Sequence, residues 1–220
     1  MMHNRFSIRL ILNAVVTAGI VMLSACGPLI SFGDDGPADE VYSLRYPGEF
    51  SAGMRQGPII YVDSPIMGDG LDGHEVAVRL AGNQRTSLQG VAWSAHLSDL
   101  VRDYVTLALA DKTSVNLISE GGVDIKAACR LGIKVWAMEF VPGASAGSDS
   151  IDIAIQFSLV RIADSSLLSH PVFSQNVKVN SSDSKGIMQA FNHAMGKAAD
   201  EYGVWLRDLA PTCGIALTGN

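Results

Sequence analysis

Residues 129–140 (CRLGIKVWAMEF) and residues 151–159 (IDIAIQFSL) decide the fold of this chain. In both stretches apolar residues alternate with other residues, and in the first of them Arg130 and Lys134 occupy the opposite positions. The alternating apolar residues are Leu131, Ile133, Val135, Ile151, Ile153, Ile155, Phe157 and Leu159. Side chains alternate between the two faces of a strand, so each stretch is predicted to be a strand with one buried face. Residues 142–150 between them are mostly small or polar, which predicts a long β-hairpin.

The apolar pattern changes phase at the end of the second stretch. Val160 and Ile162 continue it in the opposite register, which indicates a bulge or a strand end near Leu159. Other strand-like stretches lie on both sides of the hairpin, and the chain becomes strand-like from Val41 onward. These stretches are residues 59–62, 75–80, 86–91, 114–119 and 172–179.

Two further segments carry apolar residues at helical spacing. The first begins near Leu97, with Ser94 as the expected N-cap, and the second spans about Lys185 to Leu209 and is stopped by Pro211. Two such amphipathic helices and about six or seven strands predict one α/β domain of two layers. We expect a mixed or antiparallel sheet with both helices on one face.

Composition excludes several classes of protein. A hydrophobic fraction of 48% and a charged fraction of 17% are typical of a well-cored globular domain. The net charge is −6, and removal of residues 1–25 would leave 14 basic against 22 acidic residues, a net charge of −8. Such an acidic protein lacks the basic surface that nucleic acid requires, and basic charge would not hold it to a membrane.

The first 25 residues have the three parts of a secretory signal peptide. Arg5 and Arg9 make a basic start, an apolar run follows from Leu10 to Leu23, and small residues end it. A transmembrane helix is the alternative. The run is shorter than the roughly 20 residues of a span and contains Asn13 and Thr17, which favours the signal peptide.

The signal peptide ends in Leu23-Ser24-Ala25-Cys26, which resembles the lipobox of bacterial lipoproteins. The resemblance implies that the signal peptidase recognises Leu23, Ser24 and Ala25 and cleaves before Cys26. It also implies a diacylglycerol on the Cys26 sulfur and an acyl chain, palmitate, on its new amino group, and several chains together anchor a protein firmly. No aspartate follows in the second position, which by the same resemblance implies outer-membrane sorting, with the domain facing the periplasm.

The predicted organisation has three parts. Residues 1–25 form the signal peptide, residues 26–40 form the lipidated cysteine and a tether, and residues 41–220 form the periplasmic domain. The tether is rich in Gly, Pro and Asp, which is typical of a flexible linker. An irregular first segment packed on the domain is the alternative, because Leu29, Ile30 and Phe32 offer apolar contacts.

Cys129 and Cys213 remain once Cys26 is assigned to lipidation. An even pair in an oxidising compartment predicts a disulfide that would pin the C-terminal helix to the sheet. Two buried free thiols are the alternative, because spacing alone does not establish the geometry.

Catalytic and metal-binding patterns are weak in this chain. Residues 143–147 (GASAG) match the G-x-S-x-G motif around Ser145, but a strand follows where a nucleophile elbow needs a helix. The five histidines show no metal-ligand spacing, and Asp69 and Asp72 lack the other ligands of a calcium loop. We expect no catalytic residue, no metal and no cofactor other than the covalent lipid on Cys26.

Several segments, taken in order, resemble the ABC-type transport auxiliary lipoprotein family and its PqiC-like members. They are Val78-Arg79, Trp93-Ser94-Ala95-His96-Leu97, Leu159-Val160, Ala190-Phe191-Asn192-His193-Ala194 and Trp205-Leu206. The resemblance implies a non-catalytic outer-membrane component that works with an inner-membrane ABC transporter and an MCE-domain protein in moving lipids or other hydrophobic molecules. It also implies a homo-oligomeric ring. A structural lipoprotein of another envelope or secretion assembly is the alternative, and a periplasmic serine hydrolase using Ser145 is a weaker one.

Overall fold

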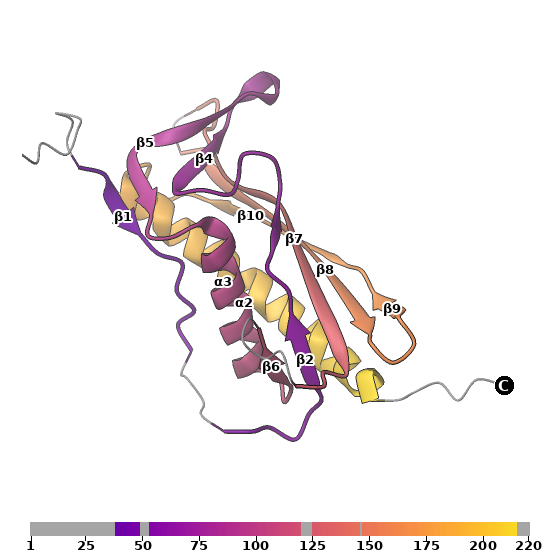
Figure 1. Ribbon diagram of the computed structural model, residues 1–220. Coiled ribbons are helices and arrows are strands. Elements are labelled where there is room, and N and C mark those ends of the chain that lie inside the picture. Colours follow the sequence, from indigo (N-terminus) through magenta and orange to yellow (C-terminus); the bar gives the residue numbers. More distant parts are fainter. Residues whose placement is uncertain (1–37, 49–52, 120–124, 146, 215–220) are drawn as a thin grey trace, which may run out of the picture. The chain divides into compact units, whose positions relative to one another are not determined.

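The computed structural model describes residues 38–48, 53–119, 125–145 and 147–214 (Figure 1). Its strands are β1 (Glu40–Tyr42), β2 (Ile59–Val62), β3 (Ile66–Met67), β4 (Glu75–Arg79), β5 (Arg85–Trp93), β6 (Asn116–Ile118), β7 (Cys129–Val141), β8 (Ser150–Arg161), β9 (Ser166–Ser169) and β10 (Val172–Lys178). Its helices are α2 (Leu97–Lys112) and α3 (Ser184–Leu209), with short 3₁₀ helices η2 (Ala81–Asn83) and η3 (Ala210–Gly214).

The predicted hairpin is confirmed as the centre of the sheet. β7 and β8 pair antiparallel from Cys129 opposite Arg161 to Val141 opposite Ser150. The alternating apolar residues are all buried on the face that meets the helices, which we call the inner face. The pairing shifts between Val135 and Ala137, so Trp136 is the extra residue of a bulge in β7.

The irregularity expected near Leu159 is present, but it lies on the neighbouring strand. β8 continues regularly to Arg161, and its pairing with β9 shifts at Leu159, where Leu168 of β9 is the extra residue. The apolar phase does not invert, because Arg161 occupies the next inner position and Ile162 is left 48% exposed. Arg161 is tolerated there because its guanidinium donates to the Thr212 carbonyl and pairs with Asp164.

Within the described residues the sheet is mixed and has ten strands, more than the six or seven expected. Its main path runs β1-β5-β4-β7-β2-β6. In addition, β3 and β8 pair with β7, and β9 and β10 pair with β8. The pairs β1 with β5, β4 with β7, β2 with β7 and β2 with β6 are parallel. The pairs of β8 with β7, β9 and β10 are antiparallel. The strands β1, β3 and β9 have only two to four residues, too few to produce a readable period in the sequence.

Both helices lie on one face of the sheet, as expected (Figure 1). α3 begins where the Asp183 carboxylate accepts the backbone N–H of Gly186 at 2.7 Å, and this hydrogen bond lowers the pKa of Asp183. The expected N-cap of α2 is wrong. Ser94 lies in the bend that follows β5, where its N–H donates to the Tyr42 carbonyl, and His96 precedes the helix without a side-chain cap.

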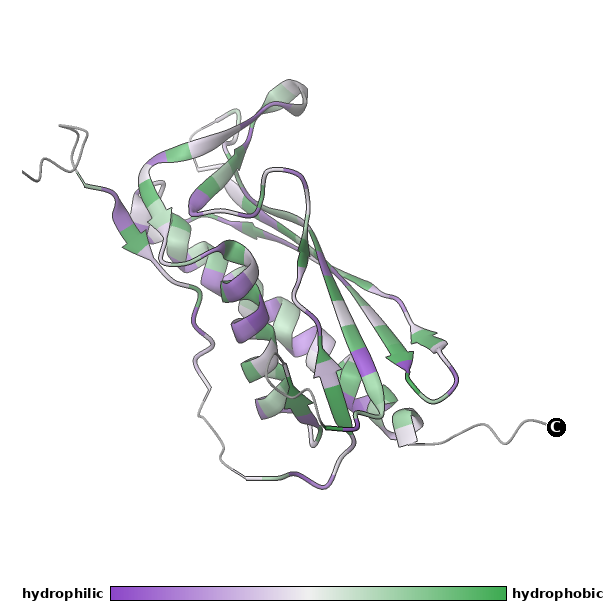
Figure 2. Cartoon of the chain, in the orientation of Figure 1, coloured by the Kyte–Doolittle hydropathy of each residue, from purple (hydrophilic) through white to green (hydrophobic). Residues whose placement is uncertain are grey.

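The core fills the space between the inner face and the two helices. Hydrophobic and more polar residues alternate along β7 and β8 (Figure 2), and the alternating hydrophobic ones are buried. Trp93 and Phe191, both quoted above for the family resemblance, meet edge to face at 5.4 Å between ring centroids. The buried Tyr104 on α2 has its pKa raised to about 12 by burial. Trp93 and Phe191 therefore serve packing.

Candidate functional site

The expected lipidation site lies outside the described residues. This applies to Cys26, to the signal-peptidase residues Leu23, Ser24 and Ala25, and to the tether up to Pro37. The described domain starts at Ala38, and β1 begins at Glu40. Neither α2 nor α3 combines the length and hydropathy of a membrane span, and this holds for every helix among the described residues.

The structure brings Cys129 and Cys213 together. Cys129 is the first residue of β7 and is fully buried, and Cys213 lies in η3 directly after α3. The two residues are joined in a disulfide across 84 positions of sequence, with 5.5 Å between their Cα atoms. The bond therefore ties the end of the last helix to the start of the central hairpin.

The residues weighed for catalysis and metal binding form no complete site, although His96 Nδ1 lies 3.9 Å from an Asp72 carboxylate oxygen. Ser145 lies in the β7–β8 loop, where its hydroxyl meets Ser148 at 3.3 Å. Asp72 accepts the backbone N–H of Ser98, and the backbone carbonyl of Asp69 accepts from Arg85. Among the residues that the structure describes, no three histidine, cysteine, aspartate or glutamate side chains gather as a metal site would need.

The sheet face turned away from the helices, which we call the outer face, carries an exposed aromatic patch around Trp136. The bulge in β7 places the Trp136 indole on this face, where it is 49% exposed. Lys134 lies 3.6 Å above the ring centroid, and the indole N–H donates to the side-chain oxygen of Gln156 at 3.0 Å. These contacts hold a large aromatic side chain in one orientation at the surface.

A histidine extends this patch. Gln156 and Ser158 on β8 both contact His170, at 2.8 Å to Nε2 and 2.7 Å to Nδ1. A serine beside a histidine resembles part of a hydrolytic triad, but both ring nitrogens are occupied, and no carboxylate among the described residues orients the ring. We define the outer-face patch as Lys134, Trp136, Gln156, Ser158 and His170, and its chemistry suits protein contact better than catalysis.

Sequence analysis missed this patch, although one signal was present. Val135 and Trp136 are adjacent apolar residues that break the alternation of the strand, which is what a bulge produces. His170 lies between β9 and β10, and its contact with β8 follows only from the pairing of both strands with β8.

A buried carboxylate lies further along the outer face. Glu139 of β7 is 2% exposed and accepts hydrogen bonds from Arg79 of β4 and Arg85 of β5. Arg79 also pairs with Asp152 of β8. The group joins four strands by charge-assisted hydrogen bonds, so it stabilises the sheet and is not free for chemistry.

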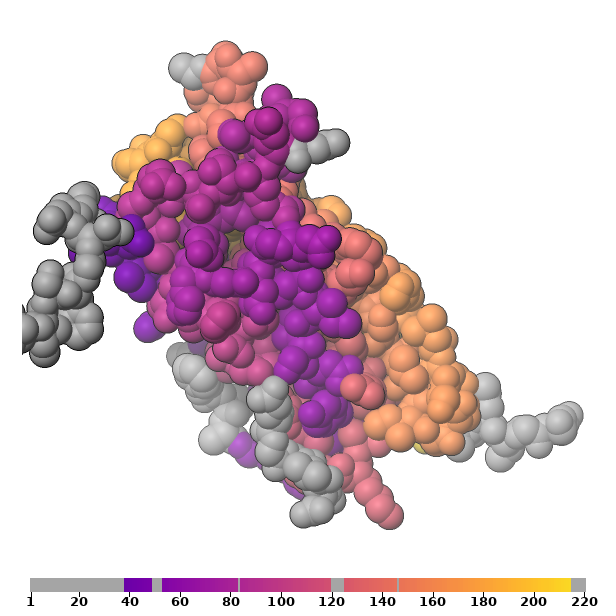
Figure 3. Space-filling view, turned by 45° about the horizontal axis from the view of Figure 1, so that its top comes forward, coloured from indigo at the N-terminus to yellow at the C-terminus, as the bar shows by residue number. Residues whose placement is uncertain are grey.

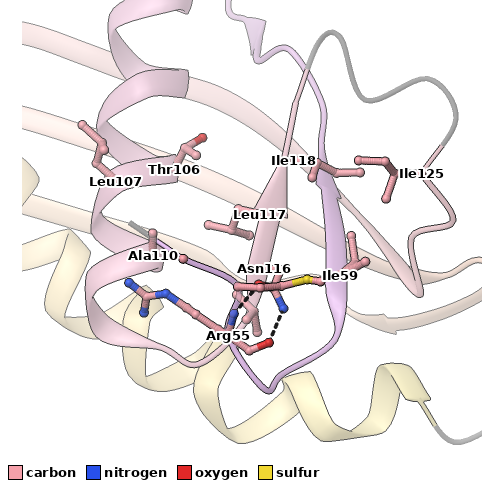
Figure 4. A pocket seen from close by; sticks show the side chains of 12 residues that line it. Arg55, Ile59, Thr106, Leu107, Ala110, Asn116, Leu117, Ile118 and Ile125 are labelled. Atoms are coloured by element: carbon pink, nitrogen blue, oxygen red, sulfur yellow. Dashed lines mark hydrogen bonds between the residues drawn. The ribbon is translucent and has the colours of Figure 1, made fainter. Parts of the chain in front are cut away.

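A second surface feature is an apolar groove beside the edge strand β6. Its volume is about 530 Å³, and α2, β2 and β6 form its walls. Figure 4 shows Thr106, Leu107 and Ala110 of α2 on one side and Ile59, Ile118 and Ile125 on the other. Arg55 and Asn116 lie at the end where α2 terminates, and the Asn116 side chain makes hydrogen bonds to the backbone N–H and carbonyl of Arg55.

The segments before α2 cover a large part of the surface seen in Figure 3. Residues between about 55 and 95, drawn in purple to magenta, occupy its middle, and the strands after residue 150, drawn in orange, run beside them. The parts of the surface are thus built from distant stretches of sequence.

Comparisons with known proteins agree with this architecture. A crystal structure of a Xanthomonas campestris protein of the DUF330 family superimposes with a TM-score of 0.65 at 18% identity, over 80% of this chain and 95% of that one. The structure of an uncharacterised protein matches with a TM-score of 0.62 at 12% identity, over 77% and 99%. At these identities the likeness concerns the fold.

Sequence comparison assigns the family. No protein with curated function matches the chain. The model of the family described as the ABC-type transport auxiliary lipoprotein component matches residues 42–202, from the last residue of β1 through most of α3. The chain therefore belongs to the ABC-type transport auxiliary lipoprotein family.

Proposed function

We propose that this protein is a non-catalytic outer-membrane lipoprotein that serves an ABC transporter and an MCE-domain protein in moving lipids or other hydrophobic molecules across the envelope. The family match over residues 42–202 carries the proposal, because it spans nearly all of the described domain. The family description supplies the link to ABC-type transport. The MCE partner, the lipid cargo and a ring of identical subunits rest on the resemblance to PqiC-like members.

The anchor in this proposal is the lipid on Cys26, with diacylglycerol on the sulfur and palmitate on the amino group. Residues 1–25 would be removed as the signal peptide, and residues 27–40 would connect the anchor to the domain facing the periplasm. A lipid anchor leaves the domain water-soluble while keeping it at one membrane, as an accessory protein between two membranes requires.

The outer-face patch supports a role in protein contact. Exposed tryptophan is enriched among the residues that dominate binding energy, and Trp136 is held in place by Lys134 and Gln156 before any partner arrives. We propose that the MCE-domain protein contacts this patch. The described residues around Ser145 and His170 lack a complete nucleophile, base and acid arrangement, so hydrolysis is not proposed.

The test is affinity purification of the natively lipidated, C-terminally tagged protein from gently solubilised membranes, with mass spectrometry of its partners. We expect an MCE-domain protein and ABC transporter subunits to co-purify with the wild type. Recovery of secretion or cell-wall machinery instead would overturn the transport proposal in favour of another envelope assembly.

Matched variants locate the contact. Trp136→Ala should lower recovery of the MCE-domain protein at least tenfold, as expected for a residue that dominates an interface. Val204→Ala changes an apolar side chain of similar exposure on α3 and should leave recovery unchanged. Equal recovery with all three proteins would remove the outer-face patch from the interface. Ser145→Ala should keep full function in cells. Loss of function in this variant would favour the alternative that the protein is a serine hydrolase.

A further inference from the structure

The groove beside β6 has the dimensions and lining of a ligand site. Its volume of about 530 Å³ lies within the range of about 300–1,000 Å³ that small-molecule sites occupy. Leu107, Ala110, Leu117 and Ile118 give it apolar walls, so the interior suits a hydrocarbon. β6 is the last strand of the sheet path, and the groove therefore opens at the edge of the domain and not in its core.

One cation lies at the end of this apolar groove. Arg55 is partly buried there, and its side chain donates to the backbone carbonyl of Thr113 at 2.6 Å. None of the acidic residues in the described parts of the chain forms an ion pair with it, whereas Arg79, Arg85, Arg130 and Arg161 all have carboxylate partners.

The position of Arg55 is fixed by its neighbours. The Asn116 side chain accepts the Arg55 backbone N–H at 2.7 Å and donates to its carbonyl at 2.8 Å (Figure 4). The contact with Thr113 places the guanidinium at the C-terminus of α2, where a cation is favourable. The C-terminus of a helix carries only about half a negative charge, which leaves net positive charge on Arg55. The hydrogen bond to Thr113 occupies one of the five guanidinium N–H groups, so the other donors remain available to a ligand.

We infer that the groove binds a long-chain fatty-acid anion, with its acyl chain between α2 and β6 and its carboxylate at Arg55. The apolar walls provide the driving force through burial of the hydrocarbon, and the unpaired guanidinium selects an anionic head group. The proposed transport role requires no ligand within the domain, so this inference goes beyond it. Its test needs neither the transporter nor the MCE-domain protein, and the two proposals can fail separately.

The experiment uses the purified, lipidated mature protein, transferred from detergent into amphipol, and a photoreactive diazirine analogue of palmitate. After irradiation and trypsin digestion, cross-links should concentrate on residues 103–112 and 113–126, which contain the groove residues of α2 and β6. Unlabelled palmitate should compete, whereas hexadecyltrimethylammonium, a cation of equal chain length, should compete at least tenfold more weakly.

Four variants make the result specific. Ala110→Trp fills the groove, and Arg55→Gln removes the charge, so each should raise the half-saturating concentration about tenfold or more. Arg55→Lys keeps the charge and should retain most of the binding. Val204→Trp adds the same indole at an exposed position of α3 and should leave the cross-links unchanged. Circular dichroism of each variant verifies that it is folded.

Three results would overturn the inference. Cross-links spread over exposed apolar side chains outside the groove, such as Ile66, Leu167 and Val172, without preference for the groove would mean non-specific partitioning. If hexadecyltrimethylammonium competed as well as palmitate, selection of an anionic head group by Arg55 would be refuted. Unchanged binding by the folded Ala110→Trp protein would refute the location.

Discussion

The inner and outer faces of the β7–β8 hairpin are built from neighbouring residues of the same two strands, yet their environments differ. On the inner face of β8, every side chain from Ile151 to Leu159 is at most 1% exposed and packs toward the helices. On the outer face the intervening positions hold Asp152, Ala154, Gln156 and Ser158, which remain partly exposed. A period of two thus gives one strand a structural side and a side available for recognition. Mutations on the two faces should differ accordingly.

Phe157→Ala on the inner face should have the largest effect on stability. The ring is fully buried and lies within 5.8 Å, between centroids, of the rings of Tyr202, Trp205 and Phe173. Its removal should lower the free energy of unfolding by about 4 kcal/mol, because it leaves a cavity among aromatic rings. Urea unfolding followed by fluorescence measures this, and a loss below about 1 kcal/mol would contradict the inner-face assignment.

Removal of the disulfide comes next. The double variant Cys129→Ala and Cys213→Ala should lower the free energy of unfolding by about 3 kcal/mol, because the unfolded chain loses a crosslink across 84 residues. Reduction of the wild type should lower its unfolding midpoint similarly, and the variant should be insensitive to reductant. A wild type that is equally insensitive would show that the two thiols are free.

Glu139→Ala tests the one outer-face position of β7 described above whose side chain is buried. Glu139 occupies an outer position, opposite Asp152, but is buried between Arg79 and Arg85. Removal of the carboxylate should lower the free energy of unfolding by about 2 kcal/mol. The effect should be smaller than for a deeply buried ion pair, because both arginines are partly exposed and water can solvate them in the variant. Glu139→Gln keeps hydrogen-bond acceptors and should cost less. If alanine there were neutral in urea unfolding, the carboxylate would contribute no net stability.

Trp136→Ala represents the outer face proper. Its indole is half exposed, and its contacts are a cation–π pair and one hydrogen bond. We expect a change in the free energy of unfolding of less than about 1 kcal/mol, compared with about 4 for Phe157→Ala. The same urea titration checks it. A loss as large as that of Phe157→Ala would assign Trp136 a structural role and weaken the case for an interface.

Tyr104→Phe should show the smallest effect at pH 7, within about 0.5 kcal/mol. Burial raises the pKa of Tyr104 to about 12, whereas the unfolded chain ionises near pH 10. The unfolded state therefore gains stability as pH rises from about 10 to 12, and the folded protein becomes less stable over that window. The variant should show a shallower decline in thermal unfolding between these pH values. An identical decline would contradict the burial of this phenol.

Long, regular elements were predictable from sequence because their periods extend over many residues. The β7–β8 hairpin, the helix ending near Leu209 and the single two-layer domain were expected and are confirmed. Short elements such as β3 were not predicted, because a strand of two residues has no readable period. The N-cap predicted at Ser94 was wrong because the presence of a residue type that can cap a helix does not show where the helical backbone begins. The irregularity expected near Leu159 is present, but its position on β9 was not predictable, because it depends on which strand pairs with β8.

By itself, the sequence determined the fold class and the resemblance to the ABC-type transport auxiliary lipoprotein family, because these depend on local periods and short contiguous motifs. Only the tertiary structure decided where the surfaces lie. The outer-face patch joins Trp136 to His170, and the groove joins Arg55 to α2 and β6, across stretches of chain that strand pairing brings together. Side chains that meet through sheet topology leave no periodic signal in the sequence, so their proximity can be recognised only from the strand pairing.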